Sequence, residues 1–288
     1  MAQKKTILDL CKMKATGEKA VWVTAYDCCF AAYAEKAGMD MILVGDSMGM
    51  VVYGYQGTIP VTMDMCINHC QAVRRGAPNT YIIGDMPFGS YHESVGDAVH
   101  NAIRFAKEAD VDAIKLEGGV AVADVIKAIA QAGIVVFGHI GLTPQSSAAM
   151  GGFRAQGRTA DSARGVIEDA IAVYEAGARA VLVEGVPEEV CTIIHKTLPI
   201  PVYGIGAGSD TDGQVLVVGD ALGMFEAFKP KFAKRYADIA SVATKAFAQF
   251  IKETKEGSFP ASEHKYSISG DSAEFKTLFK EMEAKFKG

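Results

Sequence analysis

The 288-residue sequence predicts an α/β fold, a (β/α)₈ TIM barrel with additional C-terminal helices, and three observations support this prediction. A weak repeat recurs four times, in which a helical stretch stops at Ala-Gly or Ala-Asp and a β-branched apolar run follows. Eight apolar runs are present in total. The runs are mostly continuous rather than alternating, as in parallel strands that are buried on both faces. Eight such units in one chain are typical of a closed barrel.

Each copy of the repeat marks the end of a helix and the start of a strand. A glycine just past the last helical residue can adopt the left-handed conformation that closes a helix, and the chain then enters the apolar run. The four junctions are Ala37-Gly38, Ala109-Asp110, Ala132-Gly133 and Ala176-Gly177. They predict an alternation of helix and strand. A doubly wound parallel sheet is the alternative arrangement of the same units.

The predicted elements follow one another along the chain. The strands cover 20–25, 41–44, 81–84, 113–116, 134–137, 180–183, 202–205 and 215–218. Apolar residues at helical spacing, such as Ala98 and Ala102, predict helices between the strands. Beyond residue 225 only helical patterns remain, one over 227–251 and a second over 275–286.

Composition and charge exclude several classes of protein. With 29 Lys and Arg against 34 Asp and Glu, the formal net charge is −5, which argues against binding to nucleic acid or to an anionic membrane. No segment approaches the roughly 18 apolar residues of a membrane span, and no apolar stretch typical of a signal peptide follows the basic N-terminus. Six cysteines without a Cys-x-x-Cys spacing are typical of reduced thiols. We therefore expect a globular, cytoplasmic protein.

Polar residues interrupt the apolar pattern at the ends of five consecutive predicted strands. In a (β/α)₈ barrel the active site lies at the carboxyl ends of the strands, so these side chains would converge on one mouth. They are Asp46 and Ser47 after strand two, Asp85 after strand three, Lys115 and Glu117 on strand four, His139 after strand five and Glu184 after strand six. One such residue is readily explained as a helix cap, but the whole set predicts an active site.

The carboxylates of this set indicate a divalent cation. Asp46 and Asp85 end adjacent strands and would repel each other unless a cation lay between them. Oxygen ligands without a cysteine or a pair of histidines suit Mg²⁺ better than zinc. Lys115 and Glu117 are two residues apart and share one face of their strand. Glu117 would be a third ligand of the cation or would contact it through water. A structural ion pair between Lys115 and Glu117 is the alternative.

Glu184 and His139 are the remaining candidates at this mouth. Glu184 follows three apolar residues, and a carboxylate that loses solvent there becomes a better proton acceptor, so we interpret it as a general base. The alternative is a structural glutamate paired with an arginine. His139 either binds a substrate carboxylate or forms a hydrogen bond within the core, and the residues alone favour the second role.

Two further motifs are weaker. The segment 204–208, Gly-Ile-Gly-Ala-Gly, is similar to the phosphate-binding loops found after strands seven and eight of many barrels, and a tight turn is the alternative. Cys66, His69 and Cys70 share a helical face but lack a fourth ligand, so no zinc site is expected.

A series of segments, in order along the chain, resembles the ketopantoate hydroxymethyltransferase family. The match extends from about residue 6 to His264, and the order of so many segments makes it specific. The segments are Gly45-Asp46-Ser47, Gly49 to Val52, Pro60 to Thr62, Ala72 to Ala77, Asp85 to Tyr91, Lys115 to Gly119, Gly138 to Gln145, Gln156 to Thr159 and Gly204 to Gly208.

The resemblance implies the first committed step of pantothenate synthesis. In that reaction 3-methyl-2-oxobutanoate receives a hydroxymethyl group from the co-substrate 5,10-methylenetetrahydrofolate and becomes 2-dehydropantoate. The resemblance also implies a cytoplasmic homo-oligomer of (β/α)₈ barrels, typically a decamer, whose partners are small molecules rather than nucleic acid or membrane.

The family pattern also implies a role for each matching residue. It implies that Asp46 and Asp85 bind Mg²⁺ and that Glu117 completes the shell of the ion. The proton acceptor would be Glu184. Contacts to the keto acid would come from Asp46, Ser47, Asp85, Lys115 and His139.

The sequence departs from the family pattern at three places. Gly185 stands where a cysteine is usual, and the histidine common before the aspartate of Val218-Gly219-Asp220 is missing. The third departure is the segment after His264, because the family pattern often ends near that residue. We therefore expect residues 1–264 to form a single barrel domain with its C-terminal helices, and residues 265–288 to be a helical extension.

Two other functions fit parts of the pattern. Members of the phosphoenolpyruvate mutase and isocitrate lyase group also bind α-oxo acids through Mg²⁺ in a barrel, so an α-oxo-acid lyase or mutase is the nearest alternative. Such enzymes usually carry a cysteine on a catalytic loop, and the loop after His139 has none. A catalytically silent barrel acting as an oligomeric scaffold is the other alternative. Loss of Asp46, Asp85 or Glu184 would indicate it, but all three are present.

Overall fold

Eight parallel strands form a closed barrel in the computed structural model, which describes residues 4–286. The strands are β1 (Ala20–Thr24), β2 (Met41–Val44), β3 (Tyr81–Asp85), β4 (Ala113–Glu117), β5 (Val136–Gly141), β6 (Ala180–Glu184), β7 (Val202–Ile205) and β8 (Gly213–Leu216). Each strand pairs with its neighbours in chain order, and β8 closes the ring against β1. The closed ring confirms the predicted TIM barrel and excludes the doubly wound sheet.

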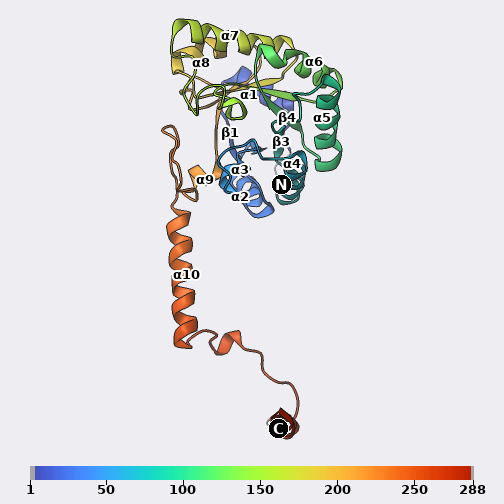
Figure 1. Ribbon diagram of the computed structural model, residues 1–288, viewed down its shortest axis with the longest axis vertical. Helices are drawn as coiled ribbons and strands as arrows, with labels where there is room; N and C mark the ends of the chain where they lie inside the picture. Colours follow the sequence, from blue (N-terminus) through green and yellow to red (C-terminus); the bar gives the residue numbers. More distant parts are fainter. Residues whose placement is uncertain (1–3, 287–288) are drawn as a thin grey trace. The chain divides into compact units, whose positions relative to one another are not determined.

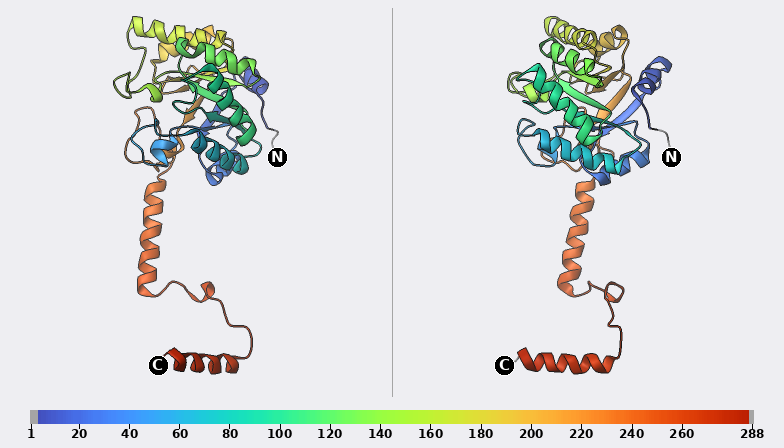
Figure 2. Two further views of the ribbon diagram at one scale, coloured as in Figure 1. Left: turned by 45° about the vertical axis from the view of Figure 1, so that its right-hand side comes forward. Right: turned by 90° about the vertical axis from the view of Figure 1, so that its right-hand side faces the viewer.

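Helices surround the strands on the outside of the barrel (Figure 1, Figure 2). They are α1 (Ile7–Thr16), α2 (Cys28–Ala37), α3 (Met48–Val51), α4 (Met63–Gly76), α5 (Val95–Ala109), α6 (Ala123–Gln131), α7 (Ala160–Glu175), α8 (Glu188–Thr197) and α9 (Val218–Ala221), with 3₁₀ turns η1 (Val120–Val122) and η2 (Pro144–Ser146). The four predicted junctions are confirmed, because Gly38, Gly133 and Gly177 all have positive φ angles. Asp110 at the fourth junction has φ 51°, and it is the one non-glycine residue with positive φ among residues 4–286.

Six predicted strands differ in their bounds, and two of them differ by more than one residue. β5 begins two residues later than the prediction of 134–137 and continues to Gly141. The eighth strand is β8, not 215–218, because backbone pairing to β1 and β7 begins at Gly213 although that residue is not apolar. Val218 instead opens α9, and its N–H donates to Thr24 Oγ1 at 3.0 Å. Backbone pairing, rather than side-chain hydropathy, sets these strand ends.

Aromatic side chains fill the inside of the barrel. The ring of Trp22 lies 5.3 Å from that of Tyr203 and 6.3 Å from that of Phe137, measured between centroids. All three residues are buried and lie at or before the middle of their strands. A second apolar layer lies between the strands and the helices. The carboxyl ends of the strands are therefore left for polar side chains.

We expect Phe137→Ala to lower the free energy of unfolding by about 3–5 kcal/mol, because the change leaves a cavity among rings that cannot collapse into it. Tyr203→Phe is the matched control. It removes only a buried hydroxyl that has no hydrogen-bond partner among residues 4–286. The cost of that change should be below about 1 kcal/mol. Urea unfolding measures both, and similar losses for the two variants would contradict this account of the core.

Residues from Ile239 onward form a second unit, separate from the unit that ends at Asp238. It contains α10 (Ile239–Glu256), a 3₁₀ turn η3 (Ser262–His264) and α11 (Ser272–Phe286). α11 confirms the predicted helix over 275–286. The helix predicted over 227–251 is wrong in its first part, since residues 227–238 are not helical and include Pro230, which disrupts a helix interior. The predicted division after His264 falls inside this unit and stays a prediction.

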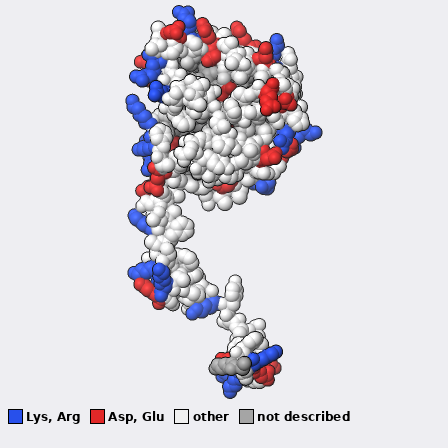
Figure 3. Space-filling view, viewed as in Figure 1, with Lys and Arg blue, Asp and Glu red and all other residues white. Residues whose placement is uncertain are grey.

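The surface of the barrel unit carries charges of both signs. Figure 3 shows acidic and basic side chains scattered over one face of this unit around a broad uncharged area. None of the helices within residues 4–286 combines the length and the hydropathy that a membrane span requires. The expectation that nucleic acid and membranes are not partners stays a prediction.

Candidate active site

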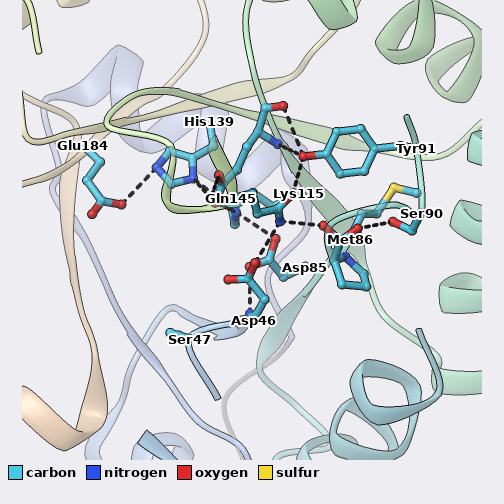
Figure 4. Close-up of polar contacts among 12 residues, drawn as sticks. Asp46, Ser47, Asp85, Met86, Ser90, Tyr91, Lys115, His139, Gln145 and Glu184 are labelled. Atoms are coloured by element: carbon cyan, nitrogen blue, oxygen red, sulfur yellow. Dashed lines mark hydrogen bonds and ion pairs between the residues drawn. The ribbon is translucent and has the colours of Figure 1, made fainter. Parts of the chain in front are cut away.

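Strand register brings the predicted charged residues together at one end of the barrel. Asp85 at the end of β3 pairs in register with Lys115 on β4, and Glu117 pairs with His139 on β5. Residues in register on adjacent strands lie side by side. The pair across β3 and β4 and the pair across β4 and β5 therefore form one cluster. Figure 4 shows Asp85, Lys115 and His139 pointing toward one another. The structure thus confirms that these strand-end residues converge.

Lys115 is the centre of this cluster. Its Nζ lies 2.8 Å from Asp85 Oδ1, 3.1 Å from His139 Nδ1 and 3.5 Å from Glu117 Oε1. Burial opposes the positive charge, but Asp85, Glu117 and Asp46 together raise the pKa of Lys115. The ammonium therefore stays charged. The carboxylate closest to Nζ is that of Asp85. Lys115 therefore stabilises several carboxylates of the cluster and does not form only the predicted ion pair with Glu117.

His139 links this cluster to Glu184. His139 Nε2 lies 3.1 Å from Glu184 Oε2, and the side chain of Glu184 is 15% exposed whereas that of His139 is 3% exposed. Burial and Lys115 oppose a charge on the imidazole, but hydrogen bonds to Glu117 and Glu184 raise the pKa of His139 to about 9. No arginine forms an ion pair with Glu184 within the described part of the chain. Glu184 is thus held by a histidine and open on the side of the cavity.

Asp46 and Asp85 supply the part of the cluster that suits a divalent cation. Both side chains are buried, and the backbone N–H of Asp46 donates to Asp85 Oδ2 at 3.0 Å. Burial raises the pKa of Asp46 well above its usual range, and the negative charges of Asp85 and Glu117 raise it further. An added cation would relieve this repulsion, and Mg²⁺ often takes only one or two protein carboxylates.

The described residues fit a cation held by two carboxylates and completed by other ligands. Residues 4–286 contain no group of three His, Cys, Asp or Glu side chains arranged to hold a metal ion. Glu117 Oε2 accepts a hydrogen bond from the backbone N–H of Gln145 at 2.9 Å, and Glu117 Oε1 faces Lys115 and His139. The protein thus already occupies both oxygens of Glu117. Both oxygens of Asp85 have protein partners in the same way, Lys115 and the N–H of Asp46, so this pattern does not separate the carboxylates. The predicted role of Glu117 as a metal ligand stays a prediction.

Gln145 and Tyr91 are buried site residues to which the sequence analysis assigned no role. Gln145 Nε2 donates to Asp46 Oδ2 at 2.8 Å and to the carbonyl of Met86 at 3.0 Å. The hydroxyl of Tyr91 donates to Gln145 Oε1 at 2.6 Å and accepts the N–H of Glu117 at 3.2 Å. Because Tyr91 donates to the amide oxygen of Gln145, the NH₂ group of that amide points to Asp46. Gln145 lies in η2 after β5, and Tyr91 lies between β3 and α5, in segments whose path no local pattern predicts.

The loop that carries Gln145 reaches the mouth because of a glycine. Gly141 at the end of β5 has φ 85°, and a Cβ there would lie 2.4 Å from the carbonyl oxygen of Glu184. Leu142 N–H then donates to that same carbonyl at 2.8 Å. Only a residue without a side chain allows β5 and β6 to approach so closely.

Replacing Gln145 with Leu should weaken metal binding through Asp46 by about 10–100-fold, since a partner that orients a metal-binding carboxylate is lost. Tyr91→Phe should give a smaller loss, because Tyr91 contacts Gln145 and not Asp46. Titration with Mn²⁺ followed by electron paramagnetic resonance measures the affinity. The matched control is Gln131→Leu on the exposed end of α6. Unchanged affinity in Gln145→Leu would contradict the positioning role.

Ser47 directly follows Asp46 in the chain and contacts Tyr26. Its Oγ is 2.8 Å from the hydroxyl of Tyr26, which follows β1, and the side chain is half-buried. A buried tyrosine therefore orients the Ser47 hydroxyl. Its predicted role in substrate binding is not tested by this contact.

The two weaker motifs of the sequence are structural within the described residues. In the 204–208 segment, a Cβ at Gly208 would lie 2.4 Å from Glu188 Cγ, and the N–H of the following Ser209 donates to Glu188 at 2.8 Å. Side chains thus occupy the loop, which favours the tight turn over a phosphate site. His69 hydrogen-bonds to Tyr53 and to the carbonyl of Tyr26, so it is not available as a zinc ligand.

A cavity of about 720 Å³ opens above the charged cluster. Its inner wall includes every predicted site residue: Asp46, Ser47, Asp85, Lys115, Glu117, His139 and Glu184. A barrel whose strand ends carry buried acids, a charged lysine and a carboxylate facing a cavity has the features of an enzyme active site.

Comparison with known proteins identifies the family within this class. A family model described as ketopantoate hydroxymethyltransferase matches residues 4–262. The chain belongs to the ketopantoate hydroxymethyltransferase family. The 3-methyl-2-oxobutanoate hydroxymethyltransferase of Alkaliphilus metalliredigens is 62% identical over 282 residues, covering 98% of this chain and 100% of that protein. The enzyme of the same name from Moorella thermoacetica is 50% identical over 268 residues, covering 92% and 100%.

Solved structures of other enzymes share the fold. A phosphoenolpyruvate phosphomutase from Streptomyces platensis subsp. rosaceus has a TM-score of 0.60 at 16% identity, covering 99% of this chain and 100% of that one. A 2,3-dimethylmalate lyase of the PEP mutase/isocitrate lyase superfamily has a TM-score of 0.57 at 15% identity, covering 100% and 99%. At such identities the likeness extends to the barrel and not to the chemistry. The predicted alternative, a lyase or mutase of this group, gains no support beyond the fold.

Proposed function

We propose that this protein transfers a hydroxymethyl group from 5,10-methylenetetrahydrofolate to 3-methyl-2-oxobutanoate, giving 2-dehydropantoate, with Glu184 as the general base. The relatives named 3-methyl-2-oxobutanoate hydroxymethyltransferase support the reaction. The observation that carries the mechanism is the placement of Glu184 on the cavity wall, with its carboxylate 3.1 Å from His139 Nε2 and beside the Lys115 cluster. That placement puts an acceptor for a proton close to a site for an anion.

The keto acid would bind with its carboxylate toward Lys115. A buried ammonium attracts an anion strongly because little water screens the charge. His139 adds positive charge on the same side, since its pKa is raised to about 9. The hydroxyl of Ser47, which also lines the cavity, would serve as a hydrogen-bond donor. These contacts would hold C3 of the substrate toward Glu184.

The residues that would hold Mg²⁺ are Asp46 and Asp85, with Glu117 as a third ligand or in contact through water. When bound, the ion supplies a Lewis acid that polarises the keto group of the substrate and makes the C3 proton more acidic. Gln145 keeps the Asp46 carboxylate in place for this purpose through the 2.8 Å hydrogen bond.

Glu184 would then remove the C3 proton. The imidazole of His139, whose Nε2 lies 3.1 Å from Glu184 Oε2, holds this carboxylate in position. A base positioned in this way contributes about 10²- to 10⁴-fold to the rate of such a step. The C3 carbanion equivalent forms a carbon–carbon bond to the methylene carbon of the folate. Of the two carbon–nitrogen bonds of that methylene carbon, one breaks as the carbon–carbon bond forms and the other breaks as water supplies the hydroxyl group. Tetrahydrofolate leaves with two added N–H protons, one from C3 by way of Glu184 and one from water.

Nuclear magnetic resonance in D₂O tests the proposed function. Purified protein is mixed with 3-methyl-2-oxobutanoate, with and without Mg²⁺ and without folate. We expect Mg²⁺-dependent loss of the C3 proton signal, with collapse of the methyl doublet to a singlet. If no exchange occurs in either condition, the assay is repeated with tetrahydrofolate. Absence of exchange there too would show that this keto acid is not the substrate.

The family resemblance also leads us to propose a cytoplasmic homo-oligomer, with a decamer as the expected size. Exposed apolar side chains on α10 support self-association: Val242, Phe247, Phe250 and Ile251 are each more than half exposed. Light scattering on the purified full chain measures the size, and a monomer at micromolar concentration would contradict the proposal.

A further inference from the structure

The cavity extends well beyond the charged cluster. A keto acid of eight heavy atoms fills only a small part of the 720 Å³. The rest is walled by the segment that follows α9 and by the segment between η2 and α7. We name this part the outer pocket. It is lined by Arg158, Asp220, Phe225, Phe228, Lys231 and Phe232.

Asp220 is a nearly buried carboxylate in the wall of the outer pocket, 7% exposed. Among residues 4–286 its side chain has no hydrogen bond and no ion pair within the usual distances. Two charged or titratable groups face it. Arg235 opposes the rise in its pKa from another segment, and Tyr26, next to Ser47, lies close enough to feel its charge. A carboxylate placed this way has no donor from the protein and faces the cavity, where a ligand can supply donors.

Phenylalanine rings form the apolar wall beside Asp220. Phe232 packs directly on Gly206 at the end of β7, where a Cβ would lie 2.6 Å from the ring. Gly206 also has φ 64°, so both its conformation and its size serve this contact. Phe228 is 56% exposed although it lines the cavity. A flat aromatic ligand would cover these rings and remove their apolar surface from water.

Two cations complete the outer pocket. Arg158 precedes α7 and Lys231 lies between Phe228 and Phe232 in the chain, and both line the cavity. Neither forms an ion pair with an acidic side chain within the described residues. A planar guanidinium and a mobile ammonium at an open rim suit carboxylates on a flexible tail.

We propose that the outer pocket binds the folate co-substrate, with Asp220 recognising the pterin ring and Arg158 and Lys231 receiving the glutamyl carboxylates. The proposal rests on the proposed function. One edge of the pterin presents two neighbouring donors, N3–H and the 2-amino group, and one carboxylate accepts both. The phenylalanine rings cover the flat face. This order places the reactive methylene carbon, which lies between pterin and tail, toward the keto acid.

Asp220→Asn should raise the melting temperature of the free protein. Burial raises the pKa of Asp220 to about 6, above its usual value of 3.8. The neutral acid therefore stabilises the fold below about pH 4, and this contribution is lost as the pH rises through 6. Above pH 6 the charged carboxylate destabilises the free protein, and Asn does not. The gain should thus be seen at pH 8 and be absent at pH 4. A lower melting temperature at pH 8 would show that Asp220 has a structural partner instead.

Anaerobic calorimetry with two probes tests the binding proposal. Tetrahydrofolate carries both pterin and glutamate, whereas 6-methyltetrahydropterin carries the ring alone. We expect Asp220→Asn to weaken both probes at least about tenfold, because a donor–donor edge then meets an amide. Proton exchange of the keto acid should fall less than about threefold, since folate is not needed for that step. Arg154→Gln and Lys229→Gln, exposed and outside the cavity lining, are the control variants.

The double variant Arg158→Gln/Lys231→Gln distinguishes binding of the pterin ring from binding of the glutamyl tail. It should weaken tetrahydrofolate about five- to tenfold and leave 6-methyltetrahydropterin within about twofold, because only the first probe has carboxylates. Equal losses for both probes would overturn the assignment of the rim. Unchanged binding of both probes to Asp220→Asn would overturn the role of Asp220. If wild-type protein exchanges the keto-acid proton and binds both probes, but neither the Asp220 variant nor the double variant weakens binding, the outer pocket proposal fails while the proposed function stands.

Discussion

Replacing Glu184 with Gln is expected to lower the rate of C3 proton exchange in 3-methyl-2-oxobutanoate by about 10²- to 10⁴-fold. The amide has nearly the same shape as the carboxylate but cannot accept the proton. The contact with His139 Nε2, which lies 3.1 Å from Glu184 Oε2, can be kept by the amide oxygen. Binding of the keto acid in the presence of Mg²⁺ should therefore be retained.

The exchange rate is measured by the methyl doublet in D₂O, and keto-acid affinity by calorimetry. Glu189→Gln is the matched control, because Glu189 is exposed on α8 in the same region of the chain. Loss of exchange with retained affinity identifies a base. Full exchange in the Glu184 variant would place the base elsewhere, and loss of both would indicate that Glu184 instead holds the site together.

The second large effect is expected for Lys115→Met. This change should lower the free energy of unfolding by about 3–5 kcal/mol at pH 8, since it leaves buried carboxylates without their cation. The side chain of Lys115 is 3% exposed, and Asp85 and Glu117 lie 2.8 and 3.5 Å from its Nζ. Methionine has a similar volume, so the loss would arise from charge and not from a cavity. Binding of the keto acid should be lost as well.

The pH dependence gives this prediction its sharpest test. Without the ammonium, the folded state binds protons at Asp46, Asp85 or Glu117 more readily than the unfolded chain does. Stability then rises as the pH falls, so the deficit should be smaller at pH 5 than at pH 8. Lys127→Met, exposed on α6, is the control. Urea unfolding at both pH values measures the effect, and a deficit independent of pH would contradict the electrostatic explanation.

The sequence predicted the barrel because its evidence is local. A helix end such as Ala37-Gly38 and the apolar run after it depend on neighbours in the chain, and the structure confirms both, with Gly38 at φ 87°. The predicted ends of strands were less accurate where backbone pairing with a neighbouring strand decides them. β8 starts at Gly213 because β1 and β7 pair there, and the helix predicted from 227 begins only at Ile239, after Pro230.

The polar side chains at the carboxyl ends of the strands were also predictable. Parallel strands point the same way, so Asp85, Lys115 and His139 had to meet once the barrel was assumed. Their distances were not predictable. That Lys115 lies closest to Asp85, and that His139 bridges Lys115 and Glu184, follows from strand register, which a single sequence does not specify.

The sequence by itself determined the alternation of helix and strand and the end of the barrel at which the predicted acids, lysine and histidine meet. Only the tertiary structure decided which loop residues join that set. Gln145 and Tyr91 reach Asp46 and Glu117 from separate loops, and Asp220 enters the cavity wall from α9. The physical reason is that strand geometry repeats every two residues and can be read locally, whereas the path of a loop depends on contacts with residues far away in the chain.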